Sequence, residues 1–123
     1  MVMLGLLDTN VVLYLLGGRL AEPLPVGQFA LSVISEMELL AWPSLDAAAE
    51  ENVQNFLDST TILELTPEIR RVAVRLRRLE NLKLPDAIIC ATAIHHQLTL
   101  WTNDDRLKNV PGVTCKAARV LTT

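Results

Sequence analysis

The sequence has little of what several common classes of protein require. Only two of its 123 residues are cysteine, Cys90 and Cys115, and they show no C-x-x-C spacing, which argues against a zinc site or a disulfide scaffold. Aromatic residues amount to 4%, too few for a platform that stacks single-stranded bases. No lysine or arginine precedes Arg19, so the apolar N-terminal run lacks the positive segment of a signal peptide.

The N-terminal run is also too short to cross a membrane. Asp8, Thr9 and Asn10 interrupt it, whereas a transmembrane helix needs about 20 consecutive apolar residues. We therefore expect this run to be buried core, with no association with a membrane, in a cytoplasmic protein whose thiols stay reduced. A chain of this length without repeats, low-complexity segments or a linker predicts one domain over residues 1–123.

Charge is distributed unevenly along the chain. Residues 1–69 contain ten acidic residues and one base, Arg19, for a net charge of −9. Residues 70–123 contain ten bases and four acidic residues, for a net charge of +6. The overall charge of −3 conceals this asymmetry, which indicates a polyanionic or strongly charged partner.

Hydrophobic patterning predicts strands that alternate with helices. Short apolar runs that stop at polar residues are typical of buried strands, and apolar positions at helical spacing indicate amphipathic helices. Strands are expected at 3–7, 29–34, 60–65, 98–102 and 113–121. Helices are expected at 10–16, 35–43, 45–59, 67–79 and 84–97, with a loop at 19–28 and a short helix or turn at 103–109. This alternation predicts an α/β fold with a mostly parallel sheet.

Acidic residues lie where such a sheet binds its ligands. Asp8 follows the first strand and Asp104 follows the fourth, and ligands of open α/β sheets bind at the carboxyl ends of the strands. Each acid also has a simpler explanation. Asp8 and Asp86 stand at expected helix starts, where a carboxylate caps the helix or favours its positive end. Asp104 and Asp105 form a pair of the kind that caps a turn.

The helix at 35–43 carries two further acids, Glu36 and Glu38. They fall on opposite edges of its apolar stripe, so periodicity does not choose between them. Capping explains each acid singly, but it does not explain why three or four acids meet at one edge of the sheet. Oxygen ligands of this kind suit Mg²⁺ or Mn²⁺, which retain several waters and accept phosphate oxygens.

Four segments together resemble the PIN domain family. They are L-L-D-T-N-V at 6–11, S-V-I-S-E-M-E-L at 32–39, L-P-D-A-I-I-C-A-T-A at 84–93 and L-W-T-N-D-D-R-L at 100–107. The likeness is greatest to the VapC-type toxins of toxin–antitoxin systems and extends over nearly the whole chain. It implies a three-layer α/β/α fold with four or five strands, and an endoribonuclease that depends on one or two ions of Mg²⁺ or Mn²⁺.

The resemblance also implies which residues form the site. The catalytic and metal-binding acids of the family pattern correspond to Asp8, Glu38, Asp86 and Asp104. Glu38 is selected over Glu36 because the family acid precedes a leucine, and Asp104 over Asp105 because it follows Thr-x. The acids are expected to hold the ions against the scissile phosphate, and cleavage then leaves a 5′-phosphate and a 3′-hydroxyl.

Three more residues are expected near these acids. Asn10 and Thr102 match family positions that support the acid cluster. Asp105 is retained as an outer or alternative ligand beside Asp104.

The helix at 67–79 is strongly basic. Its outward face is expected to carry Arg70, Arg71, Arg75, Arg77 and Arg78, while Ile69, Val72, Leu76 and Leu79 face the core. A solvated surface explains these arginines as well as contact with phosphates does. Because aromatics are scarce, choice of RNA is expected to depend on the shape of a folded substrate. The resemblance further implies a cognate VapB-type antitoxin and a homodimer.

Other functions fit the residues less well. A receiver domain of signalling proteins needs paired acids after the first strand and an aspartate after the third, but the chain has Asp8 alone and Leu65-Thr66. A haloacid-dehalogenase-type phosphatase needs D-x-D, and Asn10 takes the place of its second acid. A stand-alone RNA-processing nuclease and a non-catalytic binding module with the same fold remain alternatives to a toxin.

Overall fold

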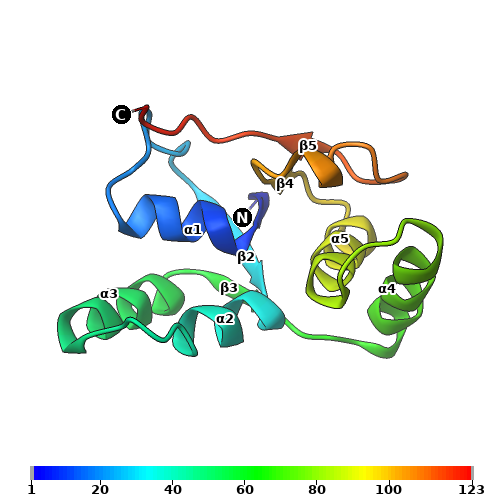
Figure 1. The fold of residues 1–123 in the computed structure, drawn as a ribbon, viewed down its shortest axis with the longest axis horizontal. Coiled ribbons are helices and arrows are strands. Elements are labelled where there is room, and N and C mark those ends of the chain that lie inside the picture. The colour runs from blue at the N-terminus through cyan, green and yellow to red at the C-terminus, as the bar shows by residue number, and fades with distance from the viewer. Residues whose placement is uncertain (1, 123) are drawn as a thin grey trace.

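A five-stranded parallel sheet forms the centre of the computed structural model, which describes residues 2–122 (Figure 1). Its strands are β1 (Met3–Leu7), β2 (Gln28–Ser32), β3 (Thr61–Leu63), β4 (Leu100–Trp101) and β5 (Cys115–Lys116). They lie in the order β3-β2-β1-β4-β5, and all four pairings are parallel. The prediction of an α/β fold with a mostly parallel sheet of four or five strands is confirmed.

Helices cover both faces of the sheet (Figure 1). They are α1 (Thr9–Leu16), α2 (Val33–Leu40), α3 (Ala47–Asp58), α4 (Pro67–Leu79) and α5 (Leu84–His96), with a one-turn 3₁₀ helix, η1 (Asp105–Leu107), after β4. The alternation of side chains along β1 separates two cores, because successive residues point to opposite faces. Leu6 packs with α4 and α5, whereas Leu7 packs with α1, α2 and α3. The chain therefore has the expected three layers.

The helices form where capping residues and apolar spacing predict them. Thr66 accepts a hydrogen bond from the backbone N–H of Ile69 at 3.2 Å, and Pro67 occupies the first turn of α4. Helix α5 is buried along most of its length, as its apolar sequence predicts. Leu79 is a correction to the predicted core face of α4, because it lies in the last turn and is 72% exposed.

Some predicted boundaries are wrong. Strand β2 ends at Ser32 rather than at Ile34, because the Ser32 hydroxyl accepts a hydrogen bond from the Ile34 N–H and starts α2 there. The last strand is much shorter than 113–121. Beyond Lys116, the side-chain amide of Asn103 donates to the Ala118 carbonyl and accepts from the Ala118 N–H, in place of a strand partner.

No helix within residues 2–122 is long and apolar enough to span a bilayer.

Candidate active site

The candidate site lies at the carboxyl edge of the sheet, beside its central strand. Strand β1 has β2 on one side and β4 on the other. The chain adds β2 and β3 on one side of β1 and then β4 and β5 on the other, so the strand order reverses between β1 and β4. In parallel α/β sheets this junction leaves a crevice in which ligands bind. Asp8 directly follows β1, and Thr102 directly follows β4. The parallel pairing therefore brings residues 94 positions apart into contact.

Asp8 is a buried carboxylate, 6% exposed, held by a neighbouring strand. It stands at the N-cap position of α1, yet its side chain makes no capping hydrogen bond. Its Oδ2 instead accepts a hydrogen bond of 2.7 Å from the fully buried hydroxyl of Thr102. The Thr102 oxygen also accepts the backbone N–H of Asp104 at 3.1 Å. Thr102 thus joins two of the predicted acids, and capping does not account for Asp8.

Glu38 reaches the same edge from α2. Its Oε1 lies 2.7 Å from Oγ1 of Thr9, and that oxygen lies 2.9 Å from Oγ of Ser35. A carboxylate only accepts, so Thr9 donates its hydrogen to Glu38, and the buried Ser35 hydroxyl is left to donate to Thr9. Sequence reasoning missed Thr9 and Ser35. Both lie within the quoted motifs, but short hydroxyl side chains show no periodicity that distinguishes a hydrogen-bond network from ordinary capping.

Asp86 and Asp104 are bridged by an arginine that sequence reasoning also missed. The guanidinium of Arg106 donates from Nε to Oδ1 of Asp104 at 3.0 Å and from Nη2 to Oδ2 at 2.6 Å. The same Nη2 atom lies 3.5 Å from Oδ2 of Asp86, which stands in the first turn of α5. The backbone N–H of Arg106 adds a further bond to Oδ1 of Asp104 at 3.0 Å. One cationic side chain therefore spans two acids from different elements.

The surroundings of the acids shift their pKa values in different directions. Burial raises the pKa of Asp8 above its ordinary value, and the charges of Asp86 and Asp104 raise it further against the lowering effect of the Thr102 hydrogen bond. Burial also raises the pKa of Asp86, opposed by the charge of Arg106. Hydrogen bonds from Arg106 lower the pKa of Asp104. Carboxyl groups whose pKa values are driven apart within one crevice are typical of functional sites.

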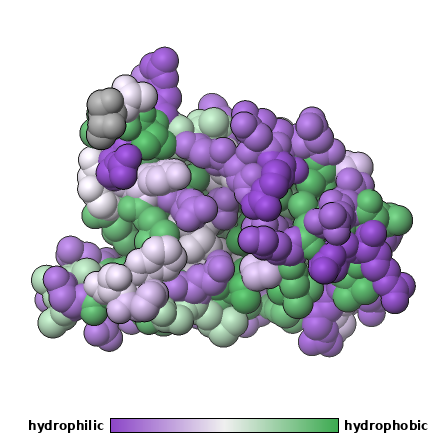
Figure 2. Space-filling model, in the orientation of Figure 1, coloured by the Kyte–Doolittle hydropathy of each residue, from purple (hydrophilic) through white to green (hydrophobic). Residues whose placement is uncertain are grey.

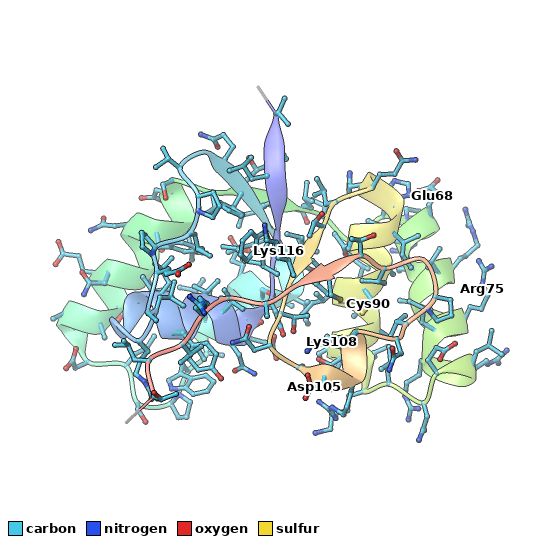
Figure 3. The ribbon with its side chains drawn as sticks, turned by 90° about the horizontal axis from the view of Figure 1, so that it is seen from above. Glu68, Arg75, Cys90, Asp105, Lys108 and Lys116 are labelled. Carbon is cyan, nitrogen blue, oxygen red and sulfur yellow. The ribbon has the colours of Figure 1, made fainter. Side chains whose placement is uncertain are left out.

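Two predicted supporting residues are not drawn into this group. Asn10 is exposed, and its side chain makes no hydrogen bond with residues 2–122. The side chain of Asp105 is 86% exposed and pairs with Lys108 at 2.7 Å, beside it at η1 in Figure 3. Thr102 is the predicted supporting residue that contacts an acid.

The five arginines of α4 are all exposed, as predicted. Arg75 extends away from α4 into solvent (Figure 3). Arg71 forms a long ion pair with Glu68 at 3.9 Å. Hydrophilic residues lie among apolar ones over this end of the molecule in Figure 2.

The donor set of the crevice matches the chemistry of a hydrated divalent cation. Within residues 2–122, no three acidic, histidine or cysteine side chains converge as ready-made ligands of one ion. Mg²⁺ does not require such a cage, because it keeps several waters and is commonly held by one or two carboxylates. The Arg106 guanidinium already occupies a place for positive charge between Asp86 and Asp104. The site therefore offers carboxylate oxygens and already accommodates a positive charge, and both properties fit Mg²⁺ or Mn²⁺.

Comparisons with known proteins agree with this geometry. A family model described as PIN domain matches residues 5–113. A chain from a toxin–antitoxin complex of Klebsiella pneumoniae is 34% identical, with a TM-score of 0.76 over 89% of this chain and 95% of that one. No curated protein matches the sequence significantly.

Two more distant structures show the same fold. A chain from the DNA-bound VapBC complex of Salmonella typhimurium has a TM-score of 0.79 at 20% identity, covering 94% of this chain and 98% of that one. A chain from VapBC2 of Rickettsia felis, bound to a fragment of promoter DNA, has a TM-score of 0.76 at 20% identity, covering 92% and 97%.

Proposed function

Because the chain belongs to the PIN domain family, we propose that it is an endoribonuclease dependent on Mg²⁺ or Mn²⁺, and the VapC-type toxin of a toxin–antitoxin pair. The observation that carries this proposal is the grouping, at one edge of the sheet, of carboxylates from the residue after β1, from α2, from α5 and from the turn after β4. They are Asp8, Glu38, Asp86 and Asp104. The charges of Asp86 and Asp104 act on Asp8, and the charge of Glu38 acts on Asp86. Like charges this close together destabilise a fold, so their grouping favours a role in binding cations.

The residues divide into acids and the groups that orient them. Asp86 and Asp104, whose side chains are 20% and 23% exposed, would hold the cation, and the buried Asp8 is a third carboxylate of the group. Thr102 fixes one oxygen of Asp8, and Thr9 fixes one oxygen of Glu38. When bound, a divalent cation lowers the pKa of its water and stabilises charge on the leaving oxygen. No serine or cysteine nucleophile is needed.

Cleavage of a panel of structured RNAs in Mg²⁺ or Mn²⁺ tests the enzyme assignment. Asp8→Asn is expected to lower the cleavage rate by roughly a hundredfold or more, since it removes a carboxylate from the group. Asp58→Asn is the matched control, because Asp58 is an exposed α3 acid that pairs with Gln54. Equal cleavage by the wild type and Asp8→Asn contradicts the mechanism.

Binding of Mn²⁺, followed by electron paramagnetic resonance, tests the metal site without reference to activity. Asp86→Asn is expected to weaken binding at least about tenfold, while Asp58→Asn leaves it unchanged. A wild type that neither binds Mn²⁺ through Asp86 nor cleaves any RNA is the result expected of a non-catalytic binding module, and it refutes the enzyme proposal.

The basic face of α4 is proposed to contact the RNA. Helices α4 and α5 are joined by a short connection, residues 80–83, so the C-terminal turn of α4 lies next to the N-terminal turn of α5, which carries Asp86. Arg77 and Arg78 belong to that C-terminal turn. They are therefore closer to the acids than Arg70 and Arg71, at the other end of the helix.

Two double variants of equal charge test this placement. Arg77→Gln with Arg78→Gln is expected to weaken binding of a structured RNA. The slope of the logarithm of affinity against the logarithm of salt concentration is expected to fall by the equivalent of about one to two phosphate contacts. Arg70→Gln with Arg71→Gln is the control at the far end of α4 and is expected to have a smaller effect. Equal losses in both variants indicate attraction by net charge alone.

An apolar groove supports a protein partner. Val74 and Leu84, each 51% exposed, line it together with Leu65, Ala73 and Ile88, and its volume is about 200 Å³. Exposed aliphatic residues that adjoin arginines are typical of interfaces. We propose that the partners are a cognate VapB-type antitoxin and a second copy of the chain.

Induced expression in a bacterial host tests the role as a toxin. Wild-type protein is expected to arrest growth, and the arrest is expected to disappear with Asp8→Asn. Coexpression of the product of a neighbouring gene is expected to restore growth if that product is the antitoxin. Metal-dependent cleavage without growth arrest indicates instead a stand-alone RNA-processing nuclease. Sedimentation of the purified chain measures whether it is a dimer.

A further inference from the structure

Arg106 takes up the atoms that a divalent cation would need. It donates to both oxygens of Asp104 and forms an ion pair with one oxygen of Asp86, and its Nη2 atom lies 2.6 and 3.5 Å from the two Oδ2 atoms. This forked contact is the geometry in which guanidinium binds carboxylate most strongly. A cation bound to the same two carboxylates would lie beside the guanidinium, and their like charges would repel each other.

The other two acids of the group are held differently. Asp8 and Glu38 accept hydrogen bonds from the neutral hydroxyls of Thr102 and Thr9. Those contacts fix the carboxylates without neutralising them. Among the described side chains, Arg106 is the one whose ion pairs join Asp86 to Asp104.

Arg106 is also placed so that it can leave. It lies in the one-turn helix η1, and its side chain is 62% exposed. The side-chain partners that it has among residues 2–122 are the two acids themselves. Rotation about its side-chain bonds moves the guanidinium into solvent without any displacement of the backbone.

We propose that Arg106 is a built-in counter-cation of the site. In the ion-free protein it bridges Asp86 and Asp104 and reduces the repulsion among the acids. A divalent cation binds there only after the guanidinium has swung away, so Arg106 competes with the cation and raises the concentration needed to fill the site. This proposal rests on the metal site proposed above.

Calorimetric titration of the EDTA-treated protein with Mn²⁺ measures the competition. Arg106→Gln is expected to bind Mn²⁺ about three- to tenfold more tightly than the wild type, because no ion pair has to be broken first. Lys108→Gln is the matched control. It removes the same charge two residues away, but Lys108 pairs with Asp105 rather than with Asp86 or Asp104. The affinity of Lys108→Gln for Mn²⁺ is therefore expected to change less than twofold.

A second measurement follows the guanidinium itself. The NMR signal of the Arg106 Nε–H, identified by its loss in Arg106→Gln, is expected to move toward the position of a solvated arginine as Mg²⁺ is added. The wild-type signals of other arginine Nε–H groups, such as that of Arg119 paired with Glu22 at 2.8 Å, are expected to stay in place. This readout is independent of catalysis.

The outcomes separate this proposal from the metal site. If Mn²⁺ binds through Asp86 with equal or lower affinity in Arg106→Gln, or if Lys108→Gln gains as much affinity, competition by Arg106 is refuted and the metal site stands. An Arg106 signal that does not move while Mg²⁺ binds refutes it as well. If Mn²⁺ binding does not depend on Asp86 in any variant, the metal site itself is refuted.

Discussion

Replacement of Thr102 by valine isolates the contact that holds Asp8. Valine has nearly the same shape, so the packing of this fully buried position is retained and only the hydroxyl is lost. The variant loses a hydrogen bond of 2.7 Å to Asp8 and one of 3.1 Å from the Asp104 N–H. A bond to a charged group contributes about 1.5–3 kcal/mol. The N–H lies in a partly exposed turn, where water replaces its partner.

The expected loss of stability is therefore about 2 kcal/mol, after allowance for the more apolar valine side chain. Urea unfolding at pH 7 in EDTA measures it. Thr92→Val is the matched control, because the buried Thr92 hydroxyl donates at 2.7 Å to the neutral carbonyl of Ile88. That variant is expected to lose at most about 1 kcal/mol.

The pH dependence identifies the source of the loss. The Thr102 hydrogen bond favours the ionised form of Asp8, so the difference between wild type and Thr102→Val is present where Asp8 is ionised and shrinks as the pH falls through the pKa of Asp8. Thr92→Val is expected to show no such trend. A loss in Thr102→Val that is no larger than that of Thr92→Val, or that is the same at all pH values, refutes the assigned role of Thr102.

Three further substitutions test the fold and the site. Burial raises the folded-state pKa of Asp8 above its ordinary 3.8, so ionised Asp8 destabilises the ion-free fold. Asp8→Asn is therefore expected to be more stable than the wild type at pH 7. Urea unfolding is expected to show that this difference in stability disappears as the pH falls below 3.8. Gly5→Ala places a Cβ 2.7 Å from Cδ1 of Trp101, and a thermal melt is expected to show a loss of about 1–3 kcal/mol. Thr66→Ala removes the cap on the Ile69 N–H and is expected to lower the free energy of unfolding by about 1 kcal/mol in urea; no loss would show that α4 is fixed by packing alone.

The order and type of the elements could be predicted from the sequence because burial dictates them. The apolar run at β1 and the nearly all-apolar α5 fit their places at the centre of the fold. Boundaries were less accessible, because single hydrogen bonds decide them. The Ser32 hydroxyl turned two apolar residues, predicted as strand, into the start of α2.

The site was predictable to the extent that it depends on topology. Parallel strands bring their carboxyl ends to one edge, which is enough to place Asp8 near Asp104. The position of Arg106 was not accessible, because an arginine two residues after an acid looks like any surface charge until the turn at η1 folds the guanidinium back. Assignment of the acids as metal ligands stays a prediction until an ion is bound.

The positions of the four site acids along the chain have a consequence for cleavage of the protein into two fragments. Asp8 and Glu38 precede the connection between β3 and α4, whereas Asp86 and Asp104 follow it. A cut at residues 64–66 gives two fragments of opposite net charge, and each fragment contains two of the four acids of the site. The fragments meet where β1 pairs with β4. Neither fragment holds a complete site, so recovery of Mn²⁺ binding on mixing would make this chain a split reporter of its own assembly.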